Sequence, residues 1–450
     1  MMPMLTLSMI VRDGAKQLPA CLESVRGIVD KILIADTGSQ DASIGVAESF
    51  GARVIAIPWD NDFAAARNAA LKQIRSVWVL SLDADEQLDE SARQQIPRLL
   101  KNCAVAGYQV TIRNYMRSLQ NRLWDRPAKP NDSSLPTARN YPAYVEHQNV
   151  RLFLHDPHIY FVGRVHESVG PTIVKAGKKL GKADFFIHHF GLAGDEAGQA
   201  RKNTLYRELG RQKISEMPDN AQAHFELGLL EMDNFHNFAD AQQLFERART
   251  LNPRFGLAWF FEGVTLKKLG QTSPALRCLG EAESSGHRTA LVAETRGDIH
   301  YNASQFSSAC ECYATGRRRD PANASLQSKF GLATLRAGDR NRGMRELRRA
   351  VTAAPQSPDV HDRLMLALVW IGDLHAAATA AHSKLASIAT CRPSDFLRAA
   401  SLWSKAGEWS RAVQIADQGL QSYPNDATLQ QASEELALGP QIPTLAKSAG

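Results

Sequence analysis

Short apolar runs alternate with helical patterns through the first part of the chain. The runs are aliphatic and β-branched and occupy residues 6–11, 32–35, 54–57 and 77–80. Such composition is typical of parallel strands that are buried on both faces. The segments between them have helical patterns, at about residues 16–28, 41–50 and 62–75. This alternation predicts an open, mostly parallel α/β sheet with helices on both faces.

The pattern lapses from about residue 116 to 145, where four prolines and the run Asn131-Asp132-Ser133-Ser134 indicate a loop or insertion. Strand-like pieces return within residues 149–190, for example at 150–153 and 185–187. We expect these pieces to complete the first domain.

The second half of the chain repeats itself with a period of about 34 residues. Prolines stand at positions 218, 253, 321, 355 and 424, separated by 35, 68, 34 and 69 residues, which is one or two periods each. Small and large residues recur at matching positions within the units, as in Leu227-Gly228, Ala241, Phe245 and Ala248. This period predicts tetratricopeptide (TPR) repeats, each a pair of helices, because an ordinary helical bundle would not keep it over six units.

These patterns divide the chain into four parts. We predict an α/β domain over residues 1–195, a helical linker over 196–218, a TPR array of about six units over 219–438, and a flexible tail over 439–450.

Composition places the chain among ordinary globular proteins. It is 44% hydrophobic and 22% charged, with a net charge of +6, which does not form the concentrated basic stripe of a nucleic-acid-binding protein. No apolar run approaches the roughly 20 residues of a spanning helix. Six cysteines lie scattered without a CxxC pair, which favours reduced thiols and a cytoplasmic location.

Two carboxylates follow the fourth predicted strand directly, in the run Asp83-Ala84-Asp85-Glu86. Acidic residues at i and i+2 beyond a buried strand can reach one hard cation together with a sugar phosphate. Mg²⁺ and Mn²⁺ prefer such oxygen ligands and commonly take only one or two from the protein. The competing interpretation is a solvated turn or a helix cap.

Other candidates follow the second strand and open the third helix. Asp36, at the end of its strand, is placed to accept hydrogen bonds from a nucleobase or ribose, whereas Asp41 fits the N-cap of the next helix. Asp62 also has the position of a cap. Arg67 and Asn68 lie inside that helix, where the arginine either reaches a diphosphate or is a surface charge.

Four motifs together resemble the family 2 glycosyltransferases, which have the GT-A fold. They are Ser8-Met9-Ile10-Val11-Arg12-Asp13, Asp36-Thr37-Gly38-Ser39-Gln40-Asp41, Asp62-Phe63-Ala64-Ala65-Ala66-Arg67-Asn68 and Leu82-Asp83-Ala84-Asp85-Glu86. The resemblance covers about residues 4–190. With the repeats, the chain looks like the bacterial branch that carries TPR arrays, to which the sublancin-type peptide S-glycosyltransferases are related.

The resemblance implies roles for individual residues. Asp36 would contact the nucleobase, while Asp83 and Asp85 would face the diphosphate and a Mn²⁺ or Mg²⁺ ion. Arg12 and Asp13 stand where the family commonly has Lys-Asn. We therefore assign donor binding to a set of five residues, namely Asp36, Arg67, Asn68, Asp83 and Arg12.

Downstream elements similar to those of the family supply the remaining candidates. They are Arg151-Leu152-Phe153, Gly163-Arg164-Val165-His166-Glu167 and Ile187-His188-His189-Phe190-Gly191. Glu167 is the candidate general base, with His166 as its rival, and a salt-bridged carboxylate beside a packed histidine is the alternative. Neighbours on a strand point to opposite faces, so one histidine should join Asp83 and Asp85 at the metal, and His189 fits the pattern better.

The predicted function is sugar transfer from a nucleotide-diphosphate sugar to a protein, peptide or glycan acceptor. The TPR groove is expected to dock the acceptor or a partner, and a homo-oligomer is one of the arrangements left open. A sugar-phosphate nucleotidyltransferase would carry a glycine-rich loop after the first strand, where Arg12-Asp13-Gly14-Ala15-Lys16 has a single glycine. A second alternative is a non-catalytic TPR scaffold whose nucleotide-sugar-binding domain is inert.

Overall fold

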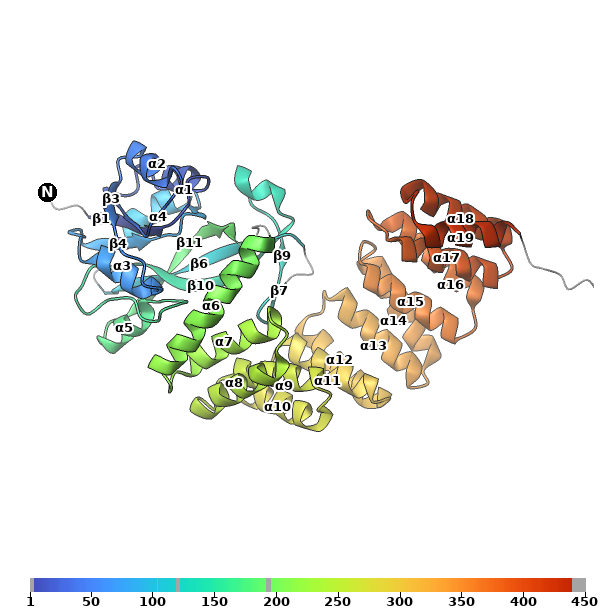
Figure 1. The fold of residues 1–450 in the computed structure, drawn as a ribbon. Coiled ribbons are helices and arrows are strands. Elements are labelled where there is room, and N and C mark those ends of the chain that lie inside the picture. The colour runs from blue at the N-terminus through green and yellow to red at the C-terminus, as the bar shows by residue number, and fades with distance from the viewer. Residues whose placement is uncertain (1–3, 103, 119–121, 192–195, 439–450) are drawn as a thin grey trace, which may run out of the picture. The chain divides into compact units, whose positions relative to one another are not determined.

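The computed structural model describes residues 4–438 except 103, 119–121 and 192–195. It separates into two compact units, Met1–Asn252 and Pro253–Gly450. The predicted tail, residues 439–450, lies outside the described residues. Figure 1 shows the sheet with its surrounding helices and the succession of helices that follows.

The first unit is built on a sheet whose strand order is β3-β2-β1-β4-β10-β6-β11-β5. The first four strands in this order are parallel, as predicted. Beyond β4 the sheet is mixed, because β10 is antiparallel to β4 and β6, while β11 is parallel to β6 and antiparallel to β5. The strands are β1 (Leu5–Val11), β2 (Lys31–Asp36), β3 (Arg53–Ala56), β4 (Trp78–Ser81), β5 (Glu86–Leu88), β6 (Gly107–Met116), β10 (Ala143–Leu154) and β11 (Leu180–His189).

Helices cover both faces of this sheet. Alternate strand residues point to opposite faces, so Ile34 joins one apolar cluster and its neighbours Leu33 and Ala35 join another. The first cluster includes residues of α1, α2 and α4, and the second includes residues of α3 and α5. Their bounds are α1 (Leu18–Ser24), α2 (Ser43–Ser49), α3 (Phe63–Leu71), α4 (Ala92–Leu99) and α5 (Gly170–Lys175).

The segment predicted as a loop at 116–145 is partly ordered by the long pair β6 and β10. Their pairing runs out to Met116 opposite Ala143, so the strands extend to both ends of the predicted loop. Between them the described residues form only short elements, namely β7 (Arg122–Leu123), β8 (Arg126–Pro127), β9 (Lys129–Pro130) and the 3-10 helix η1 (Pro136–Asn140). The strand-like pieces predicted at 150–153 and 185–187 lie in β10 and β11.

The segment predicted as a helical linker is α6 (Glu196–Glu216), a helix of the first unit that contacts the sheet domain. The Lys213 ammonium is buried and donates hydrogen bonds to the Val165 carbonyl and to Glu226, each at 2.8 Å. Arg164 pairs with Glu216 at 2.7 Å. The buried Lys213 ammonium, which binds both Val165 and Glu226, fixes α6 against residues 163–167.

Paired helices follow α6 and confirm the predicted repeats. They are α7 (Ala221–Asp233) with α8 (Phe238–Leu251), α9 (Gly256–Lys268) with α10 (Thr272–Ser284), α11 (Ala290–Asn302) with α12 (Phe306–Arg319), α13 (Ala324–Arg336) with α14 (Arg340–Ala353), α15 (Pro358–Trp370) with α16 (Leu374–Ser387) and α17 (Pro393–Lys405) with α18 (Trp409–Ser422), then α19 (Ala427–Ala437). The first pair belongs to the first unit and the others to the second.

Recurrent glycines mark the close crossing of the two helices in a pair. A Cβ on Gly228 would meet the Phe245 ring at 2.8 Å, and one on Gly297 would meet the Tyr313 ring at 2.5 Å. Both distances are too short for a carbon contact, so each first helix needs glycine there for its partner's large side chain to pack. This contact explains the small-and-large pattern that repeats in the sequence.

Gly297→Ala should lower the free energy of unfolding of the full chain by about 1–3 kcal/mol, because the added methyl overpacks the crossing with Tyr313. Gly280→Ala is the matched control, since Gly280 is also inside a helix and its Cβ would meet nothing within 4 Å. The Gly280→Ala change should raise the free energy of unfolding by about 0.5–1 kcal/mol, because alanine has the higher helix propensity. Denaturant unfolding measures both, and equal effects would contradict the crossing contact.

Candidate functional site

The sequence-predicted carboxylates meet at one edge of the sheet. The pairing of Val11 with Asp36, and of Ser8 with Ser81, puts the loops after β1, β2 and β4 side by side. This edge is formed by the carboxyl ends of the parallel strands, where α/β sheets bind their ligands.

Asp36 has one carboxylate oxygen committed to the protein and one that is not. Its Oδ2 accepts hydrogen bonds from the backbone N–H groups of Gly38 and Ser39, at 3.0 and 3.1 Å. Its Oδ1 is buried and has no hydrogen-bond partner among the described residues. A buried acceptor without a donor is costly unless a ligand supplies one. Asp36 therefore offers a ready-made acceptor for a ligand N–H or O–H group.

The loop after β2 is fastened to the loop after β1. Asp13 donates its N–H to Ser39 Oγ at 3.0 Å and accepts the Gln40 N–H at 2.7 Å. Asp41 accepts from the Ala15 N–H at 3.0 Å and from Ser43, and the hydrogen bond from Ser43 lowers the pKa of Asp41. Asp41 lies one residue before the N-cap of α2, which is Ala42. Arg12 lies exposed at this rim, 3.9 Å from Asp13.

Arg67 is the centre of a buried charge network. It is 5% exposed, so it is not the surface charge considered as an alternative. Its guanidinium donates to Asp83 Oδ1 at 2.5 Å, to Glu167 Oε1 at 2.6 Å and to Ser81 Oγ at 3.3 Å. Burial alone would lower the pKa of Arg67, but the two carboxylates outweigh it and raise the pKa.

Asp83 is held by a second arginine as well. Arg151 donates to Asp83 Oδ2 at 3.3 Å and to Glu86 Oε1 at 2.7 Å, and Glu86 also accepts the Asp83 N–H. Burial raises the pKa of Asp83, but Arg67 and Arg151 more than offset this effect and the pKa is lowered. Both oxygens of Asp83 are thus bound to arginines. Metal ligation by Asp83 stays a prediction beside these ion pairs.

Asp85 faces a histidine instead. Its Oδ2 lies 3.5 Å from His189 Nε2, and both side chains are partly exposed. His188 points elsewhere, with its Nδ1 at 2.8 Å from the Tyr115 hydroxyl. Gly191 is required beside them, because a Cβ there would stand 2.1 Å from Asp85 Oδ2.

A chain of hydrogen bonds sets the tautomer of His189. The Asn114 amide nitrogen donates to the Val145 carbonyl at 3.0 Å and lies 2.8 Å from His147 Nδ1. Its Oδ1 is 2.8 Å from His189 Nδ1, so that nitrogen must carry the proton. In the neutral ring Nε2 then keeps its lone pair on the side of Asp85, the arrangement that orients metal-binding histidines. Burial, helped by Arg151, lowers the pKa of His147 to about 4, so this neighbour is neutral.

Asp85 and His189 fit a hard cation as a pair of ligands. Among the residues that the structure describes, no group of three or more histidine, cysteine, aspartate or glutamate side chains is arranged to hold a metal. Two protein ligands are nevertheless the usual number where phosphate and water complete the shell of Mg²⁺ or Mn²⁺.

The remaining predicted residues are Asn68, which binds the backbone of Phe161, and the pair His166 and Glu167. Asn68 donates to the Phe161 carbonyl at 2.9 Å and accepts the Phe161 N–H at 2.8 Å. This clamp replaces the predicted donor contact of Asn68. Glu167 is bound to Arg67, whereas His166 is exposed, with a left-handed backbone (φ 52°).

Sequence reasoning assigned no roles to several residues of this network, among them Glu86, Asn114, His147, Arg151 and Tyr206. Tyr206 comes from α6, and its ring lies 6.0 Å from that of Phe63 and 5.6 Å from that of His166. Burial and the carboxylates of Asp83, Glu167 and Asp85 raise its pKa, so the phenol is protonated. Of these residues Glu86 and Arg151 had a local signal, Glu86 as the last residue of the acidic run and Arg151 as the first residue of the downstream element Arg151-Leu152-Phe153.

Comparisons with known proteins show what the two parts of the chain are similar to. The model of the family described as "Glycosyl transferase family 2" matches residues 7–161. The lipopolysaccharide core biosynthesis glycosyltransferase LpsC of Rhizobium meliloti is 32% identical over 124 residues, which are 26% of this chain and 45% of LpsC. The SPbeta prophage-derived glycosyltransferase SunS of Bacillus subtilis is 25% identical over 115 residues, 24% of this chain and 27% of SunS.

A TPR repeat-containing protein of Synechococcus elongatus is 46% identical over 87 residues, 19% of this chain and 22% of that protein. The chain thus spans less than half the length of each of these relatives. Among solved structures, the type IV pilus biogenesis factor PilW aligns with 47% of this chain and 97% of its own, with a TM-score of 0.40 and 17% identity. No helix within the described residues is long and apolar enough to cross a membrane.

The matched residues include the motifs that carry Asp36, Arg67, Asp83 and Asp85, and the paired helices follow them in the chain. Residues 7–161 are therefore a glycosyl transferase family 2 domain, and C-terminal TPR repeats are joined to it.

Proposed function

We propose that the chain transfers a sugar from a nucleoside-diphosphate sugar to an acceptor with the help of a divalent cation. The observation that carries this proposal is the placement of two candidate binding groups at one sheet edge. These are the buried, unpartnered Oδ1 of Asp36 and the facing pair Asp85 and His189. The first suits the N–H of a nucleobase, and the second suits a cation that binds phosphate oxygens.

The charge network prepares the site for this reaction. Arg67 and Arg151 bind three carboxylates, those of Asp83, Glu86 and Glu167, and so offset most of the negative charge beside Asp85. A cation held by Asp85 and His189 would stabilise the negative charge of the departing nucleoside diphosphate. Glu167, with one oxygen on Arg67, is proposed to take the proton from the acceptor.

Asp85→Asn should reduce donor turnover by about 100-fold or more, since loss of a charged ligand removes several kcal/mol of leaving-group stabilisation. We would measure hydrolysis of UDP- and GDP-sugars against Mn²⁺ concentration, together with thermal shifts by each sugar nucleotide. Asp184→Asn, an exposed aspartate on the same strand as His189, is the control. Unchanged Mn²⁺ dependence in Asp85→Asn would refute the cation site, and absence of any donor binding would favour the scaffold alternative.

Glu167→Gln should lower sugar transfer by about 100- to 10,000-fold while leaving donor affinity near normal, because an amide cannot accept the proton. Steady-state transfer and donor titration separate these two effects. Glu208→Gln, an exposed glutamate on α6, should change neither. A parallel loss of donor affinity would instead identify Glu167 as a structural partner of Arg67.

The TPR array is proposed to dock the acceptor or a partner protein. Stacked helical pairs generally present extended binding surfaces, and the paired helices continue well beyond the first unit. The name of LpsC further suggests a glycan acceptor, whereas SunS leaves the acceptor class open.

Ending the chain after Asn252, at the boundary between the two units, should preserve donor hydrolysis and sharply reduce transfer to the native acceptor. Circular dichroism and donor thermal shifts check that the shortened chain is folded. Undiminished transfer by a folded, donor-binding shortened chain would contradict docking on the array.

A further inference from the structure

A cavity of about 730 Å³ lies beside the charge network, within the first unit. One wall comes from the sheet domain, from β7, Trp124, β10 and residues 162–168. The other comes from α6, α7 and the turn between them, which lie outside the family 2 match.

Two parts of the site contribute residues to this cavity, the ion pairs around Arg67 and the hydrogen bonds around His189. Glu167, which shares Arg67 with Asp83, is one of its lining residues, and so is His147, which is joined through Asn114 to His189. Tyr206 lines it from the side of α6. The group that would accept a proton is therefore part of the cavity wall.

The lining has the chemistry that recognises a neutral, polyhydroxylated ligand. Trp124 exposes 38% of its surface there, and an indole face packs well against the C–H face of a sugar ring. Asp233 on α7 is an exposed carboxylate, and hydroxyl groups can donate to it. Apolar residues such as Leu123, Met217 and Leu230 also line the cavity, together with amides that both donate and accept, namely Gln148, Asn149, Asn220, Gln222 and Asn234.

Charge argues against a phosphorylated or nucleic-acid ligand. Three carboxylates line the cavity, those of Glu167, Glu226 and Asp233, and Lys213 is buried on Glu226 and Val165. Glu167 and Glu226 are paired with Arg67 and Lys213, so the exposed charges among the lining residues are one carboxylate, Asp233, and one cation, Arg122. The lining thus has no surplus of cations for an anionic ligand, and a neutral ligand needs none.

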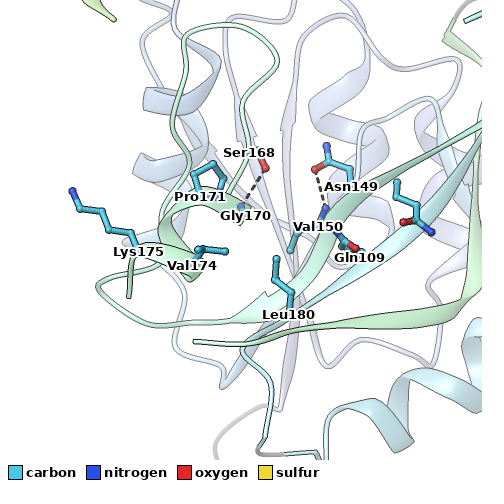
Figure 2. Close-up of a pocket in the computed structure, with 10 residues that line it drawn as sticks. Gln109, Asn149, Val150, Ser168, Gly170, Pro171, Val174, Lys175 and Leu180 are labelled. Carbon is cyan, nitrogen blue, oxygen red and sulfur yellow. Dashed lines mark hydrogen bonds between the residues drawn. The ribbon is translucent and has the colours of Figure 1, made fainter. Parts of the chain in front are cut away.

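A neighbouring cavity has a different chemistry. It is lined by residues of β10 and α5, including Asn149, Ser168 and Lys175 (Figure 2), and has a volume of about 650 Å³. The described residues around it include no carboxylate and no imidazole. It therefore lacks a group to accept a proton, and we do not assign it to the acceptor.

We propose that the cavity between the family 2 domain and α6–α7 is the acceptor site, and that the acceptor is a neutral saccharide stacked on Trp124. This proposal rests on the proposed sugar transfer. In the reaction one acceptor hydroxyl oxygen forms the bond to the donor sugar's anomeric carbon while its proton passes to Glu167. The bond from that carbon to the phosphate oxygen breaks, and the nucleoside diphosphate leaves with the electron pair.

The test uses the full chain and measures binding of methyl glycosides of glucose, galactose, mannose and N-acetylglucosamine by saturation-transfer NMR. At least one glycoside should bind, and Trp124→Ala should weaken it by about tenfold or more. Asp233→Asn, which hardly changes shape, should weaken it severalfold. Two matched controls should leave glycoside binding unchanged. They are Trp370→Ala, at a tryptophan of similar exposure (42%) in the second unit, and Asp184→Asn.

A pool of short peptides containing serine, threonine and cysteine is measured in parallel. Binding of peptides but not of glycosides overturns the proposal, as does the absence of all glycoside binding at tens of millimolar. Glycoside binding that is unaffected in both cavity variants also overturns it. Hydrolysis of the sugar nucleotide by the unchanged chain tests the proposed function separately, since water takes the place of the saccharide in that reaction.

Discussion

The site depends on one buried cation. Arg67 is enclosed by α3, β4 and residues 161–167, and it binds Asp83 on one side and Glu167 on the other. A buried charge that loses its partner destabilises a protein by about 3–5 kcal/mol, so each of these three groups requires the others. The loop that carries the acidic run and the segment that carries the candidate base are thereby fixed relative to each other, before any ligand arrives.

The same network separates two aspartates that look equivalent in the sequence. Asp83 and Asp85 are two residues apart and similarly exposed, yet both oxygens of Asp83 bind arginines, Arg67 and Arg151, while Asp85 faces His189. Asp83 therefore ties the acidic run to the charge network, and Asp85 lies beside a histidine instead. Glu86 strengthens this division, because it binds Arg151 from the first position of β5.

The sequence was sufficient for features that follow from local periodicity. The parallel strands with their covering helices, the 34-residue repeat and the position of Asp36 and Asp85 after strand ends all follow from patterns within short windows. The mixed half of the sheet was not predictable in this way. β11 pairs with β6 in parallel and with β5 in the antiparallel sense, and no local pattern specifies partners so distant in the chain.

The roles of Arg67, Asn68 and Tyr206 depend on the same long-range pairing. Arg67 meets Glu167 a hundred residues later, and Asn68 clamps Phe161. Tyr206 reaches the site because buried Lys213 binds Val165 and thereby seats α6 beside the segment that carries His166 and Glu167. Helix α6, which connects the family 2 domain to the repeats, therefore also forms one wall of the proposed acceptor cavity. This shared helix joins the cavity to the start of the TPR array.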